Sequence, residues 1–225
     1  MPGVILLTGF DAFGGDVVNP SIDLARELEG EVIAGLRVVV EQLPCEFACS
    51  TTRLFDALDR WSPQLVLATG QAAGRAELSF ERVAINLIDA RIPDNAGAQP
   101  IDEAVDPGGP AACFSTLPIK RMVAAARRSG VPAGVSYSAG TFVCNQIFYA
   151  LQHRLARYSA PIPSGFMHVP LLPEQAALRA AAGQGLAASL PLDQMVRGTR
   201  VALAAALAAV DTASAQPQGS EGRLS

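Results

Sequence analysis

Short apolar runs that end at glycine alternate along this chain with longer segments of helical periodicity. The run Val4–Thr8 stops at Gly9, and the run Leu65–Thr69 stops at Gly70. Runs without a polar face are typical of strands buried on both sides of a parallel sheet. The alternation with helical segments therefore predicts an α/β fold: a single three-layer α/β/α domain with a central twisted, mostly parallel (mixed) sheet.

The same patterns place the individual elements. We expect strands at 4–8, 36–43, 65–70, 80–88, 131–137 and 165–169, and helices at 20–28, 49–60, 118–129, 144–158 and 192–210. Asn19 and Pro20 suit the cap and the first position of the first helix. Residues 89–110 are rich in proline, glycine and aspartate, which indicates a long and functional loop. We expect one catalytic domain at 1–210 and a disordered tail at 211–225.

Composition and charge exclude several classes of partner. The longest apolar run, Val201–Val210, is about half of the roughly 20 residues that a bilayer span needs, so no membrane partner is expected. A net charge of −4 without a basic patch disfavours nucleic acid. The chain start lacks the basic region of a signal peptide, and the four cysteines form no CxxC pair. We therefore expect a cytoplasmic protein with reduced thiols, no metal and no cofactor.

One cysteine lies where a catalytic thiol would be placed. Ligands of open α/β sheets bind at the carboxyl ends of strands, so the loops after Thr8, Thr69 and Tyr137 are the places to look. The last of these loops leads into a predicted helix with Cys144 in its first turn. Free backbone N–H groups and the helix dipole favour a thiolate there, with a lowered pKa. The alternative is a small buried cysteine that only packs as a hydrophobe.

A nucleophilic thiol needs a base, and the chain has only two histidines. His153 follows Cys144 by nine residues on the same predicted helix, about half a turn out of phase, so it points away from the thiol. His168 lies in a short apolar strand, where an imidazole is either a buried core group or a catalytic base. Cys144 and His168 are therefore the one plausible dyad.

The group that would orient the imidazole stays open at this point. Four carboxylates lie near a strand that could adjoin the dyad: Glu77, Glu81, Asp89 and Asp94. Spacing alone does not choose among them.

The glycine-rich segment Gly9–Gly15 follows the first predicted strand. It has neither a GxGxxG pattern nor a following Gly-Lys-Ser/Thr, so it is a poor candidate for a nucleotide loop. Its aromatic residues, Phe10 and Phe13, suit the wall of an apolar pocket better.

Taken together and in order, these segments resemble the pyroglutamyl peptidase I family, the pyrrolidone-carboxylate peptidases, which are cysteine peptidases. The matching stretches are 8–15 with 19–21, 70–75, 80–86 with 90–95, 114–120, 138–145 and 165–170. The resemblance covers roughly residues 4 to 208. An ordered set of motifs is far more specific than any one of them.

The resemblance implies a role for each matching residue. Cys144 would be the nucleophile, His168 the general base and acid, and Glu81 the residue that orients His168. Arg91 and backbone N–H groups at the start of the Cys144 helix would stabilise the oxyanion. The pocket for the pyroglutamyl ring would be formed by Phe10, Phe13, Gln71, Ile92, Phe142 and Val143, with Asn19 supporting the loop that holds Phe10 and Phe13.

The implied activity is hydrolytic removal of N-terminal pyroglutamate from peptides through a thioester acyl-enzyme. The family also implies a homo-oligomer, a tetramer. The chain departs from the family pattern at Ala12, Ala73 and Cys45, where proline, glycine and threonine are usual. Two alternatives remain: an inactive module that binds pyroglutamyl groups, and a phosphorylase-like transferase, for which no phosphate site is visible.

Overall fold

The computed structural model describes residues 3–159 and 161–210. The expected tail at 211–225 lies outside the described residues. Along the chain the elements are β1 (Val4–Phe10), α1 (Pro20–Leu28), β2 (Val32–Ile33), β3 (Leu36–Leu43), α2 (Ser50–Trp61), β4 (Leu65–Gln71), β5 (Leu78–Glu81), β6 (Val83–Ile85), β7 (Ala112–Phe114), α3 (Ile119–Arg128), β8 (Ala133–Ser136), α4 (Val143–Leu155), β9 (Ser164–Val169), α5 (Pro173–Ala181) and α6 (Leu192–Val210).

Seven strands form one mixed sheet in the order β2-β3-β1-β4-β9-β5-β8. Strands β3, β1, β4 and β9 run parallel to one another, whereas β5 is antiparallel to β9 and parallel to β8. The last strand in the chain order, β9, is inserted between β4 and β5. A small second sheet pairs β6 with β7.

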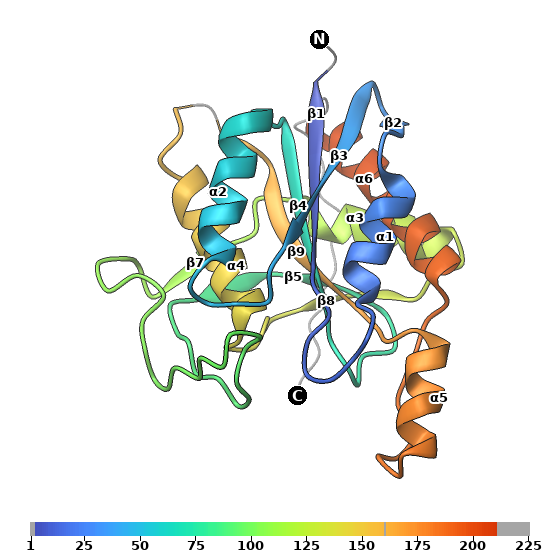
Figure 1. The fold of residues 1–225 in the computed structure, drawn as a ribbon. Coiled ribbons are helices and arrows are strands. Elements are labelled where there is room, and N and C mark those ends of the chain that lie inside the picture. The colour runs from blue at the N-terminus through green and yellow to red at the C-terminus, as the bar shows by residue number, and fades with distance from the viewer. Residues whose placement is uncertain (1–2, 160, 211–225) are drawn as a thin grey trace.

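Helices cover both faces of the main sheet, which confirms the three-layer fold (Figure 1). α1, α3 and α6 lie on one face, over a core that includes Leu7, Leu67 and Met167. α2 and α4 lie on the other face, over a core that includes Leu6 and Phe166. No helix within residues 3–159 and 161–210 is both long and apolar enough to span a bilayer.

The helix starts follow their local chemistry. Asn19 caps α1 by accepting a hydrogen bond from the backbone N–H of Ser21, at 3.0 Å, and Pro20 occupies the first turn, as expected. α4 begins differently, because the side chain of its N-cap residue, Phe142, forms no capping hydrogen bond. The first backbone N–H groups of α4 are therefore left for other partners.

The strand expected at 80–88 is wrong as a single element. β5 ends at Glu81, and the chain then leaves the main sheet to form β6. The N–H of Arg82 donates to the carbonyl of Ser136, while its carbonyl accepts from the N–H of Ser115. Within β6, Ala84 is buried and its two neighbours are only half-buried.

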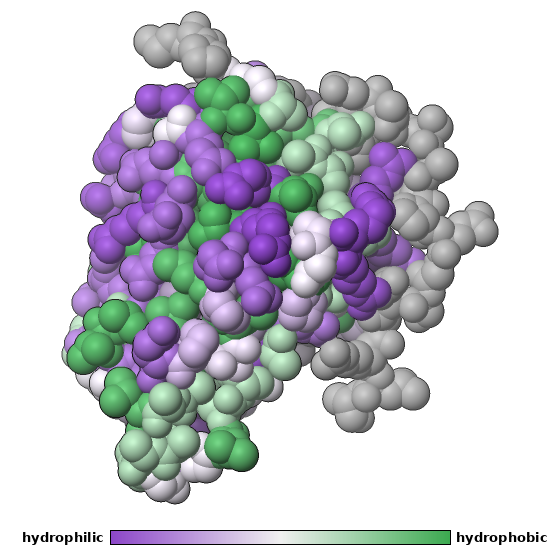
Figure 2. Space-filling model, turned by 90° about the vertical axis from the view of Figure 1, so that its right-hand side faces the viewer, coloured by the Kyte–Doolittle hydropathy of each residue, from purple (hydrophilic) through white to green (hydrophobic). Residues whose placement is uncertain are grey.

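The sequence analysis also missed α5, which projects from one end of the molecule (Figure 1). Of the residues in α5, only Gln175 is buried. Apolar colour gathers at this end of the surface (Figure 2), where Leu178 and Leu186 are 66% and 100% exposed. α5 and the loop that follows it therefore form an arm with an exposed apolar surface.

Candidate active site

The register of the sheet brings two candidate residues, His168 and Glu81, onto the face that α4 covers. Gly70 on β4 is the register partner of His168 on β9, and Ser79 on β5 is the register partner of His168 on the other side. Glu81 follows Ser79 by two residues, so it lies on the same face of the sheet. The side chains of His168 and Glu81 therefore lie beside the backbone of Gly70, beneath the start of α4.

His168 and Glu81 form the shortest polar contact of this group. Nδ1 of His168 lies 2.7 Å from Oε1 of Glu81, and both side chains are almost completely buried. Of the four carboxylates that spacing had left open, Glu81 is therefore one that contacts the imidazole directly. Asp94 instead caps its own loop, accepting from the backbone N–H groups of Phe47, Ala96 and Ala98.

Arg75, which the sequence analysis missed, forms an ion pair with the same carboxylate. Nη1 of Arg75 lies 3.0 Å from the same Oε1 of Glu81, and Nη2 donates to the carbonyl of Ser138. Arg75 therefore joins the buried carboxylate to the loop that leads to Cys144. Arg75 lies in the 70–75 stretch that matches the family pattern, and this position was the signal that could have identified it.

Cys144 lies in the first turn of α4, directly above Gly70. A β-carbon built on Gly70 would lie 2.7 Å from Sγ of Cys144. Neighbouring strands are about 4.8 Å apart, and His168 lies on the strand beside Gly70. Sγ of Cys144 therefore lies about one strand spacing from His168. His153 lies elsewhere, with Nδ1 3.1 Å from Oδ2 of Asp106.

The electrostatics of the thiol differ from the expectation. Burial raises the pKa of Cys144 above its ordinary value; the neighbouring Cys45 and Glu81 raise it further, while Arg75 and the backbone N–H of Cys144 lower it. The lowered pKa expected from the helix terminus alone is therefore wrong. Desolvation outweighs the dipole here, so burial favours the neutral thiol over the thiolate.

A cavity of about 850 Å³ opens above these residues. Cys144 and His168 both line it, and so does Arg91. Its wall also contains four of the residues expected to bind the ring: Phe13, Gln71, Ile92 and Phe142. Arg179 and Gln184, from the α5 arm, line the cavity as well and were not predicted.

The other predicted pocket residues lie beneath this wall. Phe10 and Val143 are buried in the core at 2% and 0% exposure, and neither is among the described residues that line the cavity. Asn19 donates from Nδ2 to the carbonyl of Asp11, within the loop between Phe10 and Phe13.

The long loop at 89–110 is fastened on two sides. The N–H of Asp89 donates to the carbonyl of Thr141, and Oγ1 of Thr141 donates to the carbonyl of Asp89. On the other side, the N–H of Asn95 donates to the carbonyl of Cys45. These bonds hold Arg91 and Ile92 at the cavity.

Burial is the main cause that raises the pKa of the Cys45 thiol, to about 12. This thiol is therefore unreactive at neutral pH.

One carboxylate ties the α5 arm to the cavity wall. Oδ2 of Asp16 accepts from Nε2 of Gln71 at 2.7 Å, from Nε2 of Gln175 at 3.2 Å and from Nη2 of Arg179 at 2.9 Å. Gln175 also donates to Oε1 of Gln71. This network joins the β1–α1 loop, the end of β4 and α5.

In chemical terms, the arrangement is that of a covalent hydrolase. It combines a thiol at a helix N-terminus, an imidazole oriented by a buried carboxylate, and an adjoining cavity with apolar walls. Among the described residues, no group of three or more His, Cys, Asp or Glu side chains is arranged to hold a metal ion.

Comparison with known proteins identifies the family to which this arrangement belongs. A sequence model of the family described as pyroglutamyl peptidase matches residues 4–209. The chain belongs to the pyroglutamyl peptidase family. The family and the enzyme class expected from the sequence are thereby confirmed, and no comparison favours an inactive binding module.

Individual relatives agree with this assignment. The pyrrolidone-carboxylate peptidase of Cupriavidus taiwanensis is 54% identical over 204 residues, covering 90% of this chain and 92% of the relative. Pyroglutamyl peptidase I of Bacillus amyloliquefaciens is 44% identical, with a TM-score of 0.86 over 92% of this chain and 98% of that structure. A mutant pyrrolidone carboxyl peptidase of Pyrococcus furiosus is 38% identical, with a TM-score of 0.89 over 92% and 99%.

Proposed function

We propose that this member of the pyroglutamyl peptidase family hydrolyses the bond after an N-terminal pyroglutamate, with Cys144 as nucleophile and His168 as general base and acid. The observation that carries the proposal is the 2.7 Å contact between Nδ1 of His168 and Oε1 of Glu81, buried beneath the helix turn of Cys144. Glu81 is the residue that orients His168. The arrangement meets the requirements of nucleophile, base and orienting group.

The first step is attack by the sulfur. Because Nδ1–H of His168 donates to Glu81, Nε2 keeps its lone pair and accepts the thiol proton. Sγ of Cys144 forms a bond to the carbonyl carbon, and the carbonyl electron pair moves to oxygen. Because burial raises the pKa of Cys144, the site favours uptake of this proton by His168 during the attack.

The oxyanion needs fixed donors. Backbone N–H groups in the first turn of α4 have no side-chain cap, and Arg91 lines the cavity. Loss of one such donor costs about 2.7–4 kcal/mol in other hydrolases that form covalent intermediates. We assign oxyanion stabilisation to these groups.

The intermediate then collapses in the usual order. His168 gives its proton to the departing amine nitrogen, the C–N bond breaks, and a thioester to Cys144 remains. Water, deprotonated by His168, attacks the thioester and releases pyroglutamate and the thiol.

The lining of the cavity supports selectivity for a neutral ring. Phe13, Ile92 and Phe142 present apolar surface, and the rings of Phe13 and Phe142 lie 6.0 Å apart. An ordinary N-terminus carries a charged amine, whose burial against these side chains would be costly. The lactam of pyroglutamate is uncharged. We therefore take peptides with N-terminal pyroglutamate as the substrates, bound by the residues named from the family pattern.

We also propose that the protein works as a cytoplasmic homo-oligomer. The exposed Leu178 and Leu186 of the α5 arm support a second copy as its partner, because apolar side chains on such a projection favour association. Light scattering on the wild type and on the double variant Leu178→Asp/Leu186→Asp tests this. A wild-type monomer would overturn it. The need for reduced thiols supports the cytoplasm.

The decisive experiment compares two fluorogenic amides of the same amine, one pyroglutamyl and one prolyl. We expect release of the amine from the pyroglutamyl amide alone. The Cys144→Ala variant should lose about 10⁴-fold or more in kcat/KM with an unchanged melting temperature. Equal turnover by wild type and variant would rule out Cys144 as nucleophile.

A further inference from the structure

The buried carboxylate of Glu81 carries a charge that a neutral His168 does not balance. Oε1 of Glu81 meets Nδ1 of His168 at 2.7 Å, and Oε2 is buried without a hydrogen-bond partner among the described residues. An imidazole that is to accept the thiol proton must itself be neutral. A buried carboxylate with a neutral partner is unfavourable, so this pair needs a cation nearby.

Arg75 supplies the cation from the edge of the site. Its Nη1 lies 3.0 Å from Oε1 of Glu81, and its side chain is 27% exposed, whereas that of Glu81 is 0% exposed. The chain reaches this position through a turn at Gly74, whose φ of +90° favours glycine, and the N–H of Arg75 donates to the carbonyl of Ala72. The guanidinium therefore stays in contact with water while it pairs with the buried carboxylate.

A second hydrogen bond of Arg75 reaches the loop before the nucleophile. Nη2 donates to the carbonyl of Ser138 at 3.0 Å, and this loop leads into the helix turn of Cys144. The planar fork of a guanidinium suits two contacts in fixed directions, which the ammonium of a lysine matches less well. Arg75 therefore contacts the supports of both the base and the thiol.

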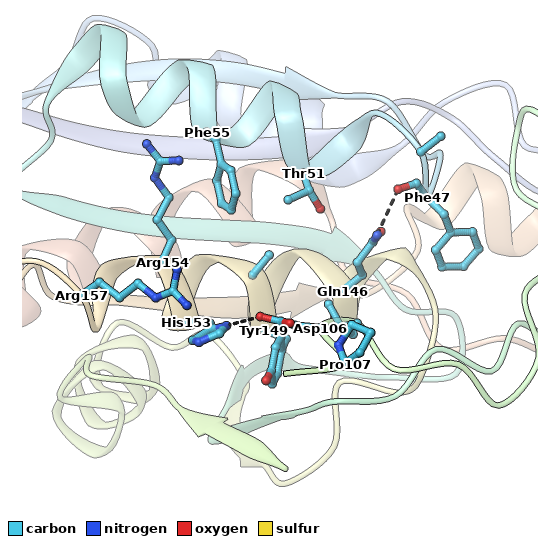
Figure 3. A pocket seen from close by; sticks show the side chains of 13 residues that line it. Phe47, Thr51, Phe55, Asp106, Pro107, Gln146, Tyr149, His153, Arg154 and Arg157 are labelled. Carbon is cyan, nitrogen blue, oxygen red and sulfur yellow. Dashed lines mark hydrogen bonds and ion pairs between the residues drawn. The ribbon is translucent and has the colours of Figure 1, made fainter. Parts of the chain in front are cut away.

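The arginine of α4 itself lies far from this carboxylate. Arg154 lies beside His153 in the last turn of the helix (Figure 3), whereas the nucleophile is in the first turn. Arg154 forms an ion pair of its own, with Asp59, and its side chain is 28% exposed. It resembles Arg75 in exposure and in pairing but not in place, so it is the matched control.

We propose that Arg75 is a positioning residue for the hydrolysis, which keeps Glu81 ionised and directed at Nδ1 of His168. The proposal rests on the function proposed for Cys144 and His168. Without Arg75, the buried carboxylate is balanced only by a proton, held by Glu81 itself or by His168. A proton on Glu81 removes the acceptor that orients the imidazole, and a proton on His168 occupies the nitrogen that must accept from the thiol.

The loss of Arg75 should therefore slow the chemical step and leave substrate binding intact, because Arg75 is not among the described residues that line the cavity. The first test is steady-state hydrolysis of a pyroglutamyl amide by Arg75→Met, with Arg154→Met as the control. We expect kcat to fall about 10- to 100-fold, the loss usual for groups that orient a metal-binding histidine. KM should stay within about two-fold of the wild-type value.

The charge-conserving variant Arg75→Lys should recover part of this loss, because it keeps the charge but not the fork. A normal kcat in Arg75→Met, or a change in KM alone, would overturn the proposal.

A double variant separates positioning of Glu81 from support of the Ser138 loop. If Arg75 acts through Glu81, Arg75→Met/Glu81→Gln should have the same kcat as Glu81→Gln, because groups that act as a unit are not additive. The double variant buries no unpaired carboxylate, so the comparison holds even where Arg75→Met alone does not fold. A further loss of about ten-fold in the double variant would assign Arg75 to the loop and refute the inference.

Alkylation of Cys144 gives a readout that needs no turnover. Arg75 lowers the pKa of Cys144, so labelling by iodoacetamide should be several-fold slower in Arg75→Met and unchanged in Arg154→Met. Mass spectrometry measures both rates. Unchanged labelling in Arg75→Met would overturn the role of Arg75. Slowed labelling in a protein whose wild type hydrolyses no pyroglutamyl amide would overturn the proposed function and support the role of Arg75.

Discussion

Sγ of Cys144 lies so close to Gly70 that a β-carbon on Gly70 would stand 2.7 Å from it. The same carbon would stand 2.9 Å from Cζ of Phe166. Gly70 is therefore the residue of β4 that lets the start of α4 approach the sheet. The thiol of Cys144 and the imidazole of His168 both lie beside Gly70, because Gly70 is also the register partner of His168.

Gly70→Ala should displace the thiol and lower both activity and stability. We expect a large loss of kcat/KM and a destabilisation of about 1–3 kcal/mol, the usual cost of overpacking. Hydrolysis rates and urea unfolding measure the two effects. Gly108→Ala is the matched control, because its β-carbon would meet only Oδ1 of Asp106, at 3.7 Å. Wild-type activity in Gly70→Ala would contradict the placement of Cys144.

Glu81→Gln should reduce kcat much more than it changes KM. The amide has nearly the same shape, but it neither stabilises a protonated His168 nor pairs with Arg75. We expect a loss in kcat of up to about 10⁴-fold, as when the orienting carboxylate of a triad is neutralised. Steady-state kinetics on a pyroglutamyl amide measure it. The exposed Glu103→Gln is the control, and a Glu81→Gln enzyme with near-normal kcat would exclude the orienting role.

Alkylation of Cys144 should continue to accelerate with pH beyond the ordinary range of a thiol. Burial raises the pKa of Cys144, so the reactive thiolate becomes populated only at higher pH. In His168→Ala, where the imidazole is absent, labelling by iodoacetamide should rise steadily through pH 9 without a plateau. Mass spectrometry resolves each cysteine, and Cys45 should stay unlabelled at neutral pH because its pKa is about 12. A plateau below pH 8 would instead indicate a lowered pKa.

A pH-dependent contribution to stability is expected from Glu31 and Arg200, which join the end of α1 to α6. The hydrogen bonds from Arg200, at 2.7 and 2.8 Å, lower the pKa of Glu31. The folded state therefore favours the carboxylate, so the contribution is present at neutral pH and is lost as pH falls through this lowered pKa.

Glu31→Gln should accordingly reduce the free energy of unfolding at pH 7 by less than about 1 kcal/mol, because the pair is partly exposed. Below the ordinary glutamate pKa of 4.5, the difference between variant and wild type should shrink. Urea unfolding at pH 7 and below pH 4.5 measures the difference in the free energy of unfolding, with the exposed Glu29→Gln as control. A difference that grows in acid would contradict the assignment.

Elements with a local chemical signal could be predicted from the sequence, and those that depend on distant contacts could not. The bounds of α1 follow from its cap, Asn19, and its first residue, Pro20. α5 was missed because its one buried side chain is the polar Gln175, which leaves no apolar periodicity to detect. The break between β5 and β6 depends on backbone bonds from Arg82 to residues 115 and 136, which no local pattern encodes.

The same division holds for the site. Cys144 and His168 could be paired because the chain contains so few imidazoles and because helical phase sets His153 aside. Choosing Glu81 required either the family pattern or the register of β5 against β9. The ion pair of Arg75, and the direction in which the pKa of Cys144 shifts, depend on burial in the folded protein.

The insertion of β9 between β4 and β5 has a consequence for synthesis on the ribosome. β9 comes after both of its neighbours, β4 and β5, in the chain. The growing polypeptide can therefore pair β1, β3 and β4, while the strand position beside β4 stays unfilled. The strand that fills this slot carries His168. The insertion of β9 therefore completes the sheet and brings the imidazole beside the thiol in one step. If His168 is the base that we propose, we expect the nascent chain to gain peptidase activity only after translation has passed β9.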